Sequence, residues 1–166
     1  MGMVHVETIE VGAGGAASIE FTSIPQDGVD LQVVISARST TTENQFVIRF
    51  NNSSSGYSGK RLEGSGSAAF SEAGYTAGIL IYGLTQSSWT ANTFSNLSCT
   101  MSNYASSNYK SVSLDSVSEN NATLSFAEIN AALWSNTAAI TSVKIAGISG
   151  NLAQYSTASL YKITAD

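Results

Sequence analysis

Alternation of apolar and polar residues with a period of two is the feature that most constrains the fold of this chain. Val143 and Ile145 alternate with polar residues near the C-terminus. Tyr161 and Ile163 repeat the pattern after a glycine-bounded break at residues 147–150. Successive side chains of a β-strand point to opposite faces, so the pattern predicts strands with one buried and one solvent-facing side. We expect these closing strands in the interior of a sheet, where they complete the core.

The same alternation recurs between short turn-forming segments along the rest of the chain. Residues 31–37 give the clearest strand of the first half, and residues 46–50 form its expected neighbour. The other candidates are 4–11, 19–21, one short strand within the loop-rich segment 51–78, 79–82, 94–101, 109–117 and 124–133. About ten short strands separated by turns are typical of a sandwich or barrel. We therefore predict an all-β fold, an antiparallel β-sandwich of jelly-roll type.

One of these segments also fits a helix. Ser125 and Glu128 have the spacing of a capping box, while Phe126, Ile129 and Leu133 fall at helical intervals. Both a strand and a helix remain open for this segment, and the strand is the preferred interpretation.

The composition indicates a neutral surface around a single core. Charged residues make up 11% of the chain, whereas about a quarter is typical, so Ser, Thr, Asn and Gly must cover much of the surface. These residue types suit strands and turns. A chain of 166 residues is long enough for one core, and we predict a single domain over residues 1–166. Residues 1–11 form an edge strand or an arm that docks on a neighbour.

Charge and cysteine content exclude several classes of function. The net charge is -5, and the seven Lys and Arg residues are scattered singly, whereas a nucleic-acid partner needs a clustered basic face. Neither a secretion signal nor an apolar run of membrane-spanning length is evident, so we expect no membrane partner. The single cysteine, Cys99, cannot form an intramolecular disulfide, and the fold must therefore rest on its apolar core.

The usual catalytic residue types are scarce. His5 is the only histidine, and although a Ser-His-Asp triad through it stays open, its setting between two valines favours a half-exposed strand residue. Cys99 shares strand parity with Leu97 and Met101, which indicates a small buried hydrophobe rather than an activated thiolate. One histidine and one cysteine cannot assemble an ordinary zinc site.

Carboxylates offer two further candidates for chemistry. Asp27 and Asp30 flank a turn whose oxygen-rich spacing would tolerate calcium, although turn geometry alone explains them. Asp115, Glu119 and Glu128 are the candidates for the carboxylate pair of a glycoside hydrolase, but their scatter over two strands argues against a pair. We therefore predict no catalytic residue, no cofactor and no metal site.

Aromatic residues in the polar loops are the one surface feature that suggests binding. Flat amphipathic rings can stack on sugars or anchor a protein interface, and they can equally cap the ends of a sandwich. The candidate glycan or partner contacts are Tyr57, Tyr75, Trp89, Tyr104 and Tyr109, with Tyr82 in the same class. Trp134 follows Leu133 and is expected in the core instead.

Five segments together carry a resemblance to a known group of proteins. These segments are Phe21–Leu31, Ser36–Ser39, Asn103–Ser111, Leu133–Val143 and Ser156–Tyr161. In them the chain resembles short all-β virion proteins of tailed bacteriophages, common in marine and cyanobacterial phages. The likeness spans nearly the whole chain, from about residue 9 to 163. The group typically ends in Leu-Tyr-Gly-Ile, whereas Lys162 replaces that glycine here.

The resemblance implies a non-enzymatic protein that decorates the head or the tail of the virion, often as a homotrimer. Our leading hypothesis is a capsid decoration or cement protein. Its expected partner is the major capsid protein, and its expected location is the virion, which is assembled in the host cytoplasm. The alternative is a tail-fibre or receptor-binding domain that recognises host polysaccharide through its loop aromatics. A depolymerase is the third hypothesis, and it lacks a catalytic set.

Overall fold

The computed structural model describes residues 2–165; Met1 and Asp166 lie outside the described residues, so the segment predicted at 1–11 is described from Gly2 onward. Within this range the chain forms twelve strands and no helix. The strands are β1 (Gly2–Glu10), β2 (Ser18–Phe21), β3 (Asp30–Ala37), β4 (Phe46–Phe50), β5 (Tyr57–Gly64), β6 (Ala69–Ala73), β7 (Ile79–Ile81), β8 (Ser95–Met101), β9 (Lys110–Glu119), β10 (Ser125–Trp134), β11 (Val143–Gly147) and β12 (Thr157–Thr164).

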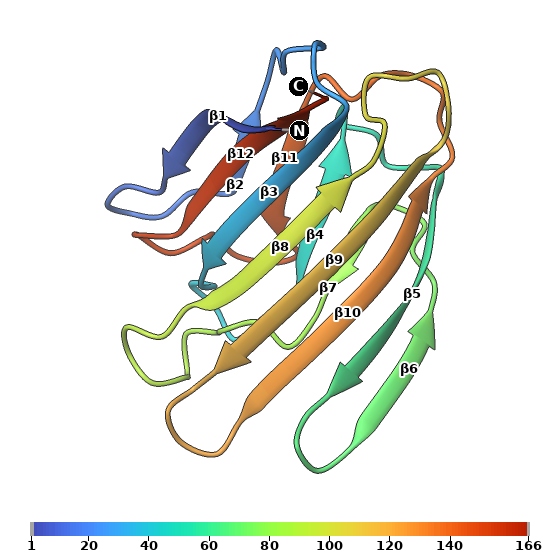
Figure 1. The fold of residues 1–166 in the computed structure, drawn as a ribbon. Coiled ribbons are helices and arrows are strands. Elements are labelled where there is room, and N and C mark those ends of the chain that lie inside the picture. The colour runs from blue at the N-terminus through green and yellow to red at the C-terminus, as the bar shows by residue number, and fades with distance from the viewer. Residues whose placement is uncertain (1, 166) are drawn as a thin grey trace.

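The strands form two antiparallel sheets packed face to face. The larger sheet has eight strands in the order β1-β12-β3-β8-β9-β10-β5-β6 and lies in front in Figure 1. The smaller sheet has four strands in the order β2-β11-β4-β7 and lies behind it. The predicted all-β fold and its β-sandwich architecture are confirmed, whereas the jelly-roll connectivity stays a prediction.

Alternation along the strands produces the core between the sheets. On β3, Leu31, Val33 and Ile35 are buried, while the residues between them reach solvent. The smaller sheet supplies large buried rings such as Phe46 and Phe50. Removing such side chains from water is the main favourable contribution to folding, at about 25 cal/mol for each Å² of apolar surface.

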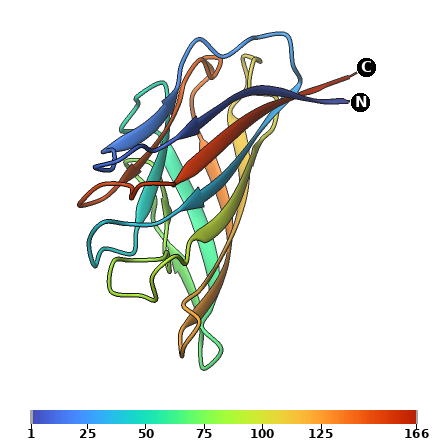
Figure 2. The same cartoon turned by 90° about the vertical axis from the view of Figure 1, so that its left-hand side faces the viewer.

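The closing strands lie where the alternation places them. β11 pairs with both β2 and β4, and β12 pairs with both β1 and β3, so each is an interior strand of its sheet. β1 is the edge strand beside β12 and has an irregularity in register between His5 and Glu7. As a result the two ends of the chain leave the molecule side by side (Figure 2).

Two expectations about local structure differ from the fold. The helical alternative for residues 124–133 is wrong, because β10 occupies Ser125–Trp134 and pairs along its length with β9 and β5. Segment 51–78 contains a hairpin of two strands, β5 and β6, instead of one short strand. All five residues of β6 are exposed, so its sequence has no alternation to reveal it.

Candidate functional site

The aromatic residues predicted as surface contacts are mostly buried. Tyr57, Tyr75, Trp89 and Tyr104 are all at most 7% exposed, whereas Tyr109 is 57% exposed. A ring without an exposed face cannot stack on a sugar, so the prediction is corrected for the four buried rings. Of the five predicted contacts only Tyr109 lies on the surface, and Tyr82, placed in the same class, is half-buried with the Arg61 guanidinium over its ring.

Hydrogen bonds show what the buried tyrosines do instead. The Tyr57 hydroxyl accepts a hydrogen bond from the Phe50 backbone N–H at 2.8 Å, and burial raises the pKa of this hydroxyl. The Tyr104 hydroxyl accepts from the Gly28 N–H at 3.1 Å and donates to the carbonyl of Pro25. These hydroxyls therefore satisfy backbone groups of neighbouring segments, which is the structural role of a ring that caps a sandwich.

Trp89 also has a packing role. Its ring stacks on that of Phe126 with centroids 6.0 Å apart and an interplanar angle of 12°. Arg38 fixes the same loop by donating to the carbonyls of Trp89 at 2.8 Å and Thr90 at 2.9 Å. Trp134 lies in the core, as predicted, at 1% exposure.

The scarce catalytic residue types are kept apart. His5 is exposed on β1, where its Nε2 lies 2.8 Å from the Thr8 hydroxyl and its ring packs edge-on against Tyr161. Cys99 is buried on β8, as predicted, and burial, with a contribution from Asp115, raises the pKa of its thiol to about 12. A thiol with this pKa is not a nucleophile at neutral pH.

The carboxylates singled out by sequence do not converge. Asp115 and Glu119 lie on the exposed face of β9, whereas Glu128 on β10 is buried at 2% exposure. Asp27 pairs with Lys162 at 2.6 Å, which lowers the pKa of this aspartate, and Asp30 accepts the Asn103 N–H at 2.8 Å. Within residues 2–165, no group of three or more His, Cys, Asp or Glu side chains is placed to hold a metal ion.

Polar side chains do converge on the inner side of the larger sheet, at a place that the sequence analysis did not single out. Arg61 on β5 donates to Glu72 on β6, with Nη2 2.8 Å from Oε2, and also to Glu63 on its own strand. Its Nη1 lies 3.7 Å from Oε2 of Glu128 on β10. Its guanidinium carbon lies 3.8 Å from the centre of the Tyr82 ring. We call these five residues, together with Tyr75 and Asn130, the Arg61 cluster.

The partners within the Arg61 cluster satisfy one another. Glu128 accepts the Tyr82 backbone N–H at 3.0 Å and a side-chain N–H of Asn130, and the Asn130 carbonyl in turn accepts the Tyr75 hydroxyl. Burial raises the pKa of Glu128 despite these hydrogen bonds and the nearby guanidinium. Burial opposes the charge of Arg61, but hydrogen bonds to Glu72 and Glu63 outweigh it and raise the guanidinium pKa.

The Arg61 cluster leaves almost no room for a ligand. The hollow beside it, lined by Arg61, Glu72, Tyr75 and Tyr82 among others, has a volume of about 10 Å³. That is about the volume needed for one water molecule. The geometry therefore supports a structural role, in which the cluster ties β5, β6 and the Tyr75 and Tyr82 segments to β10.

The outer side of the same strands is apolar. Leu62 on β5, Val117 on β9 and Ile129 on β10 are 55%, 51% and 63% exposed. Ile129 pairs directly with Leu62, and Ala127 pairs with Val117, so the four side chains adjoin on one face. We call Leu62, Val117, Ala127 and Ile129 the outer patch. Exposed apolar groups that adjoin in this way mark interaction surfaces in soluble proteins.

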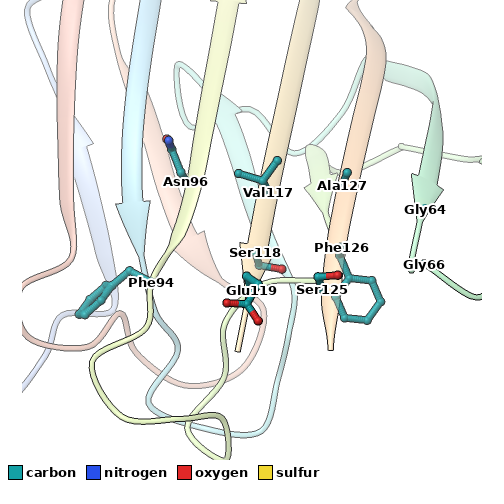
Figure 3. Close-up of a pocket in the computed structure, with 10 residues that line it drawn as sticks. All are labelled: Gly64, Gly66, Phe94, Asn96, Val117, Ser118, Glu119, Ser125, Phe126 and Ala127. Carbon is teal, nitrogen blue, oxygen red and sulfur yellow. The ribbon is translucent and has the colours of Figure 1, made fainter. Parts of the chain in front are cut away.

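Shallow hollows surround the outer patch. One of about 560 Å³ crosses the end of the sheet from Gly64 and Ala127 to Val117 and Asn96 (Figure 3). Phe94 also lines it, but its ring lies apart from the other side chains, at the far side of β8. The polar side chains that line it are Asn96 on β8, Ser118 and Glu119 on β9 and Ser125 on β10, and Glu119 pairs directly with Ser125 in the sheet.

Comparison with known proteins adds no family. No family model matches the chain, and no curated protein matches it. None of the described residues belongs to a helix long and apolar enough to cross a membrane. The resemblance to bacteriophage virion proteins therefore stays a prediction.

Proposed function

We propose that this protein is a non-catalytic structural component of a bacteriophage virion, a decoration or cement protein bound to the outer shell of the capsid. Its partner is the major capsid protein, and its copies sit across contacts between capsid subunits. Binding to the assembled shell alone stabilises that shell by mass action, because the contacts are lost when the subunits separate. The homotrimer implied by the resemblance belongs to this proposal, since closed symmetry places many copies economically.

The outer patch is the observation that carries the proposal. A protein that acts by packing against other proteins needs exposed apolar surface and does not need a reaction centre. The outer patch supplies such surface on β9 and β10, whose remaining exposed side chains are serine, alanine, Asp115 and Glu119. The convergent polar groups of the Arg61 cluster are paired with one another, and all but Glu72 are at least partly buried.

The receptor-binding alternative loses part of its support. It relied on aromatic rings in loops, and four of the five proposed rings are buried. Tyr109 alone does not form the platform of several rings that sugar stacking usually requires.

Isolated virions test the proposal. Quantitative mass spectrometry should give a copy number comparable to that of the capsid subunits, and imaging should place the protein on the shell. Particles that lack the protein should lose their genome at a lower temperature. A few copies at the tail tip would overturn the capsid assignment.

A further inference from the structure

We propose that the outer patch is the contact surface for a second copy of this chain, in an isologous pair related by a two-fold axis. The inference rests on the proposed function only in part: it specifies the partner of one surface, and it can hold or fail in solution without any capsid. At one end of three adjacent strands, β5, β10 and β9, polar side chains lie on the buried face and apolar side chains on the exposed face.

At the end of the larger sheet near the β9–β10 turn, the usual arrangement is inverted. Glu63, Glu128 and Asn130 are buried, while Leu62 and Ile129 beside them in sequence are more than half exposed. Apolar side chains that stay more than half exposed in this arrangement gain little from folding of the monomer. Removing them from water requires a partner. A one-residue shift in strand register would turn them inward, but it would also turn the Arg61 cluster outward and break all its pairs.

The shape of the outer patch is complementary to itself. Ile129 and Leu62 are paired across β10 and β5 and are the largest exposed side chains of the outer patch, and we call this pair the ridge. On one side of it lies a hollow of about 310 Å³ that includes Ala127 and Gly64, and on the other a hollow of about 480 Å³ that includes Ala131. A ridge of large side chains flanked by small residues allows the ridge of one copy to enter a hollow of the other.

Charge is complementary about the same ridge. Lys60 on β5 and Asp115 on β9 are both exposed on the outer side, on opposite flanks of β10 and two residues apart in register. Among the described residues, neither side chain has a hydrogen bond or an ion pair, although opposite charges such as Lys162 and Asp27 are paired elsewhere on the molecule. A two-fold axis in the plane of the contact, crossing β10 between residues 129 and 131, brings Lys60 of each copy to Asp115 of the other, so one contact is made twice.

The available area suits a weak, specific pair. Three strands spaced by about 4.8 Å span about 14 Å, and the length of β5 spans about 27 Å, which gives a face of about 390 Å² per copy. Both copies together bury about 780 Å², less than the roughly 1,000 Å² of a standard specific interface, so the pair is of the weak, transient kind. We therefore expect a dissociation constant in the micromolar range.

Sedimentation equilibrium of the purified full chain over a range of concentrations tests the pair. The two-fold contact predicts a dimer, or a hexamer if a trimer forms through another surface. Ile129→Glu should weaken self-association at least tenfold, because it places a carboxylate in the apolar contact. Ile148→Glu is the control, since Ile148 is 45% exposed outside the outer patch and its replacement should leave association unchanged.

A charge exchange identifies the contact itself. Lys60→Glu and Asp115→Lys should each weaken association, and the double variant should restore it, because the exchange recreates the opposite pair. A monomer or a trimer at all concentrations, or a double variant weaker than both single variants, would overturn the inference. Virions distinguish the two proposals: if Ile129→Glu fails to self-associate but is incorporated at normal copy number, the outer patch serves contact between copies and the capsid is bound through another surface.

Discussion

Two ends of the same three strands differ in which side they bury. At the end near Trp134, β9, β10 and β5 direct Val112, Trp134 and Tyr57 into the core, and the outer side carries Ser58, Ser111 and the half-buried Leu133. At the other end the same strands, still paired in register, bury Glu128 and expose Ile129. The pleat is unbroken between the two ends, so the chemistry of the inner side changes while the geometry does not.

The difference shows how one sheet can serve two purposes. The apolar end is covered by the smaller sheet and derives its stability from apolar burial. The inverted end is held by an ion-paired network, whose net contribution is smaller because desolvation of its charges offsets their attraction. We infer that the apolar side chains of the inverted end are exposed because they serve association. As a result, this end contributes less to the stability of the fold.

The largest expected effect lies at the apolar end. Trp134→Ala should lower the free energy of unfolding by about 3–5 kcal/mol, because it removes a side chain that contacts the rings of Phe50 and Tyr57 and leaves a cavity. Chemical denaturation monitored by circular dichroism measures the change. Trp134→Phe should cost less, since the indole N–H is a buried donor with no partner in the described part of the chain. Equal losses for the two variants would contradict this account.

The next effect lies in the Arg61 cluster. Arg61→Met should lower the free energy of unfolding by about 2–3 kcal/mol, because it leaves the buried Glu63 and Glu128 without their cation. The loss is moderate because Arg61 and Glu63 are not completely buried. The loss should shrink in acid, because burial raises the pKa of Glu128, and the protonated carboxyl no longer needs a cation. Lys144→Met is the control, as Lys144 makes a surface pair with Glu20 at 3.6 Å and should contribute less than about 1 kcal/mol.

A pH effect of intermediate size distinguishes the two ends further. Burial raises the pKa of Glu128 in the folded state, so the fold favours the protonated carboxyl. Its contribution to stability is complete below the unfolded-state pKa and is lost as the pH rises through the folded-state pKa. The stability of the wild type relative to Glu128→Gln should therefore fall as the pH rises above about 4.5. Parallel pH profiles for the two proteins would show that Glu128 does not titrate in this way.

Much of the fold could be predicted from local pattern. Alternation located β3, β8 and β11, and shared parity predicted the burial of Cys99 correctly. β6 was not predicted, because an exposed edge strand has no buried face and therefore no alternation of apolar and polar residues. The helical spacing of Phe126, Ile129 and Leu133 misled because β10 carries its apolar residues on both faces.

The Arg61 cluster could not be predicted from local pattern either. It joins Arg61 and Glu63 to Glu128 across strands that are distant in sequence, and only the pairing of β5 with β10 brings them together. One signal was available: charged residues stand at alternate positions 61 and 63 of one strand, and polar ones at 128 and 130 of another. If a strand may carry polar residues on its inner face, the alternate spacing predicts that residues 61 and 63, and residues 128 and 130, share such a face.

The smallest expected effect provides the most direct test of the inversion. Leu62→Ala should change the stability of the monomer by less than about 0.5 kcal/mol, because Leu62 is 55% exposed and makes its contacts outside the core. Leu114→Ala removes the same atoms from a side chain that is 1% exposed and should cost about 2–5 kcal/mol. Measurement must be made at low protein concentration, so that self-association does not stabilise the wild type. Equal losses for the two leucines would mean that the outer patch is already covered within one chain, and the contrast between the two ends would fail.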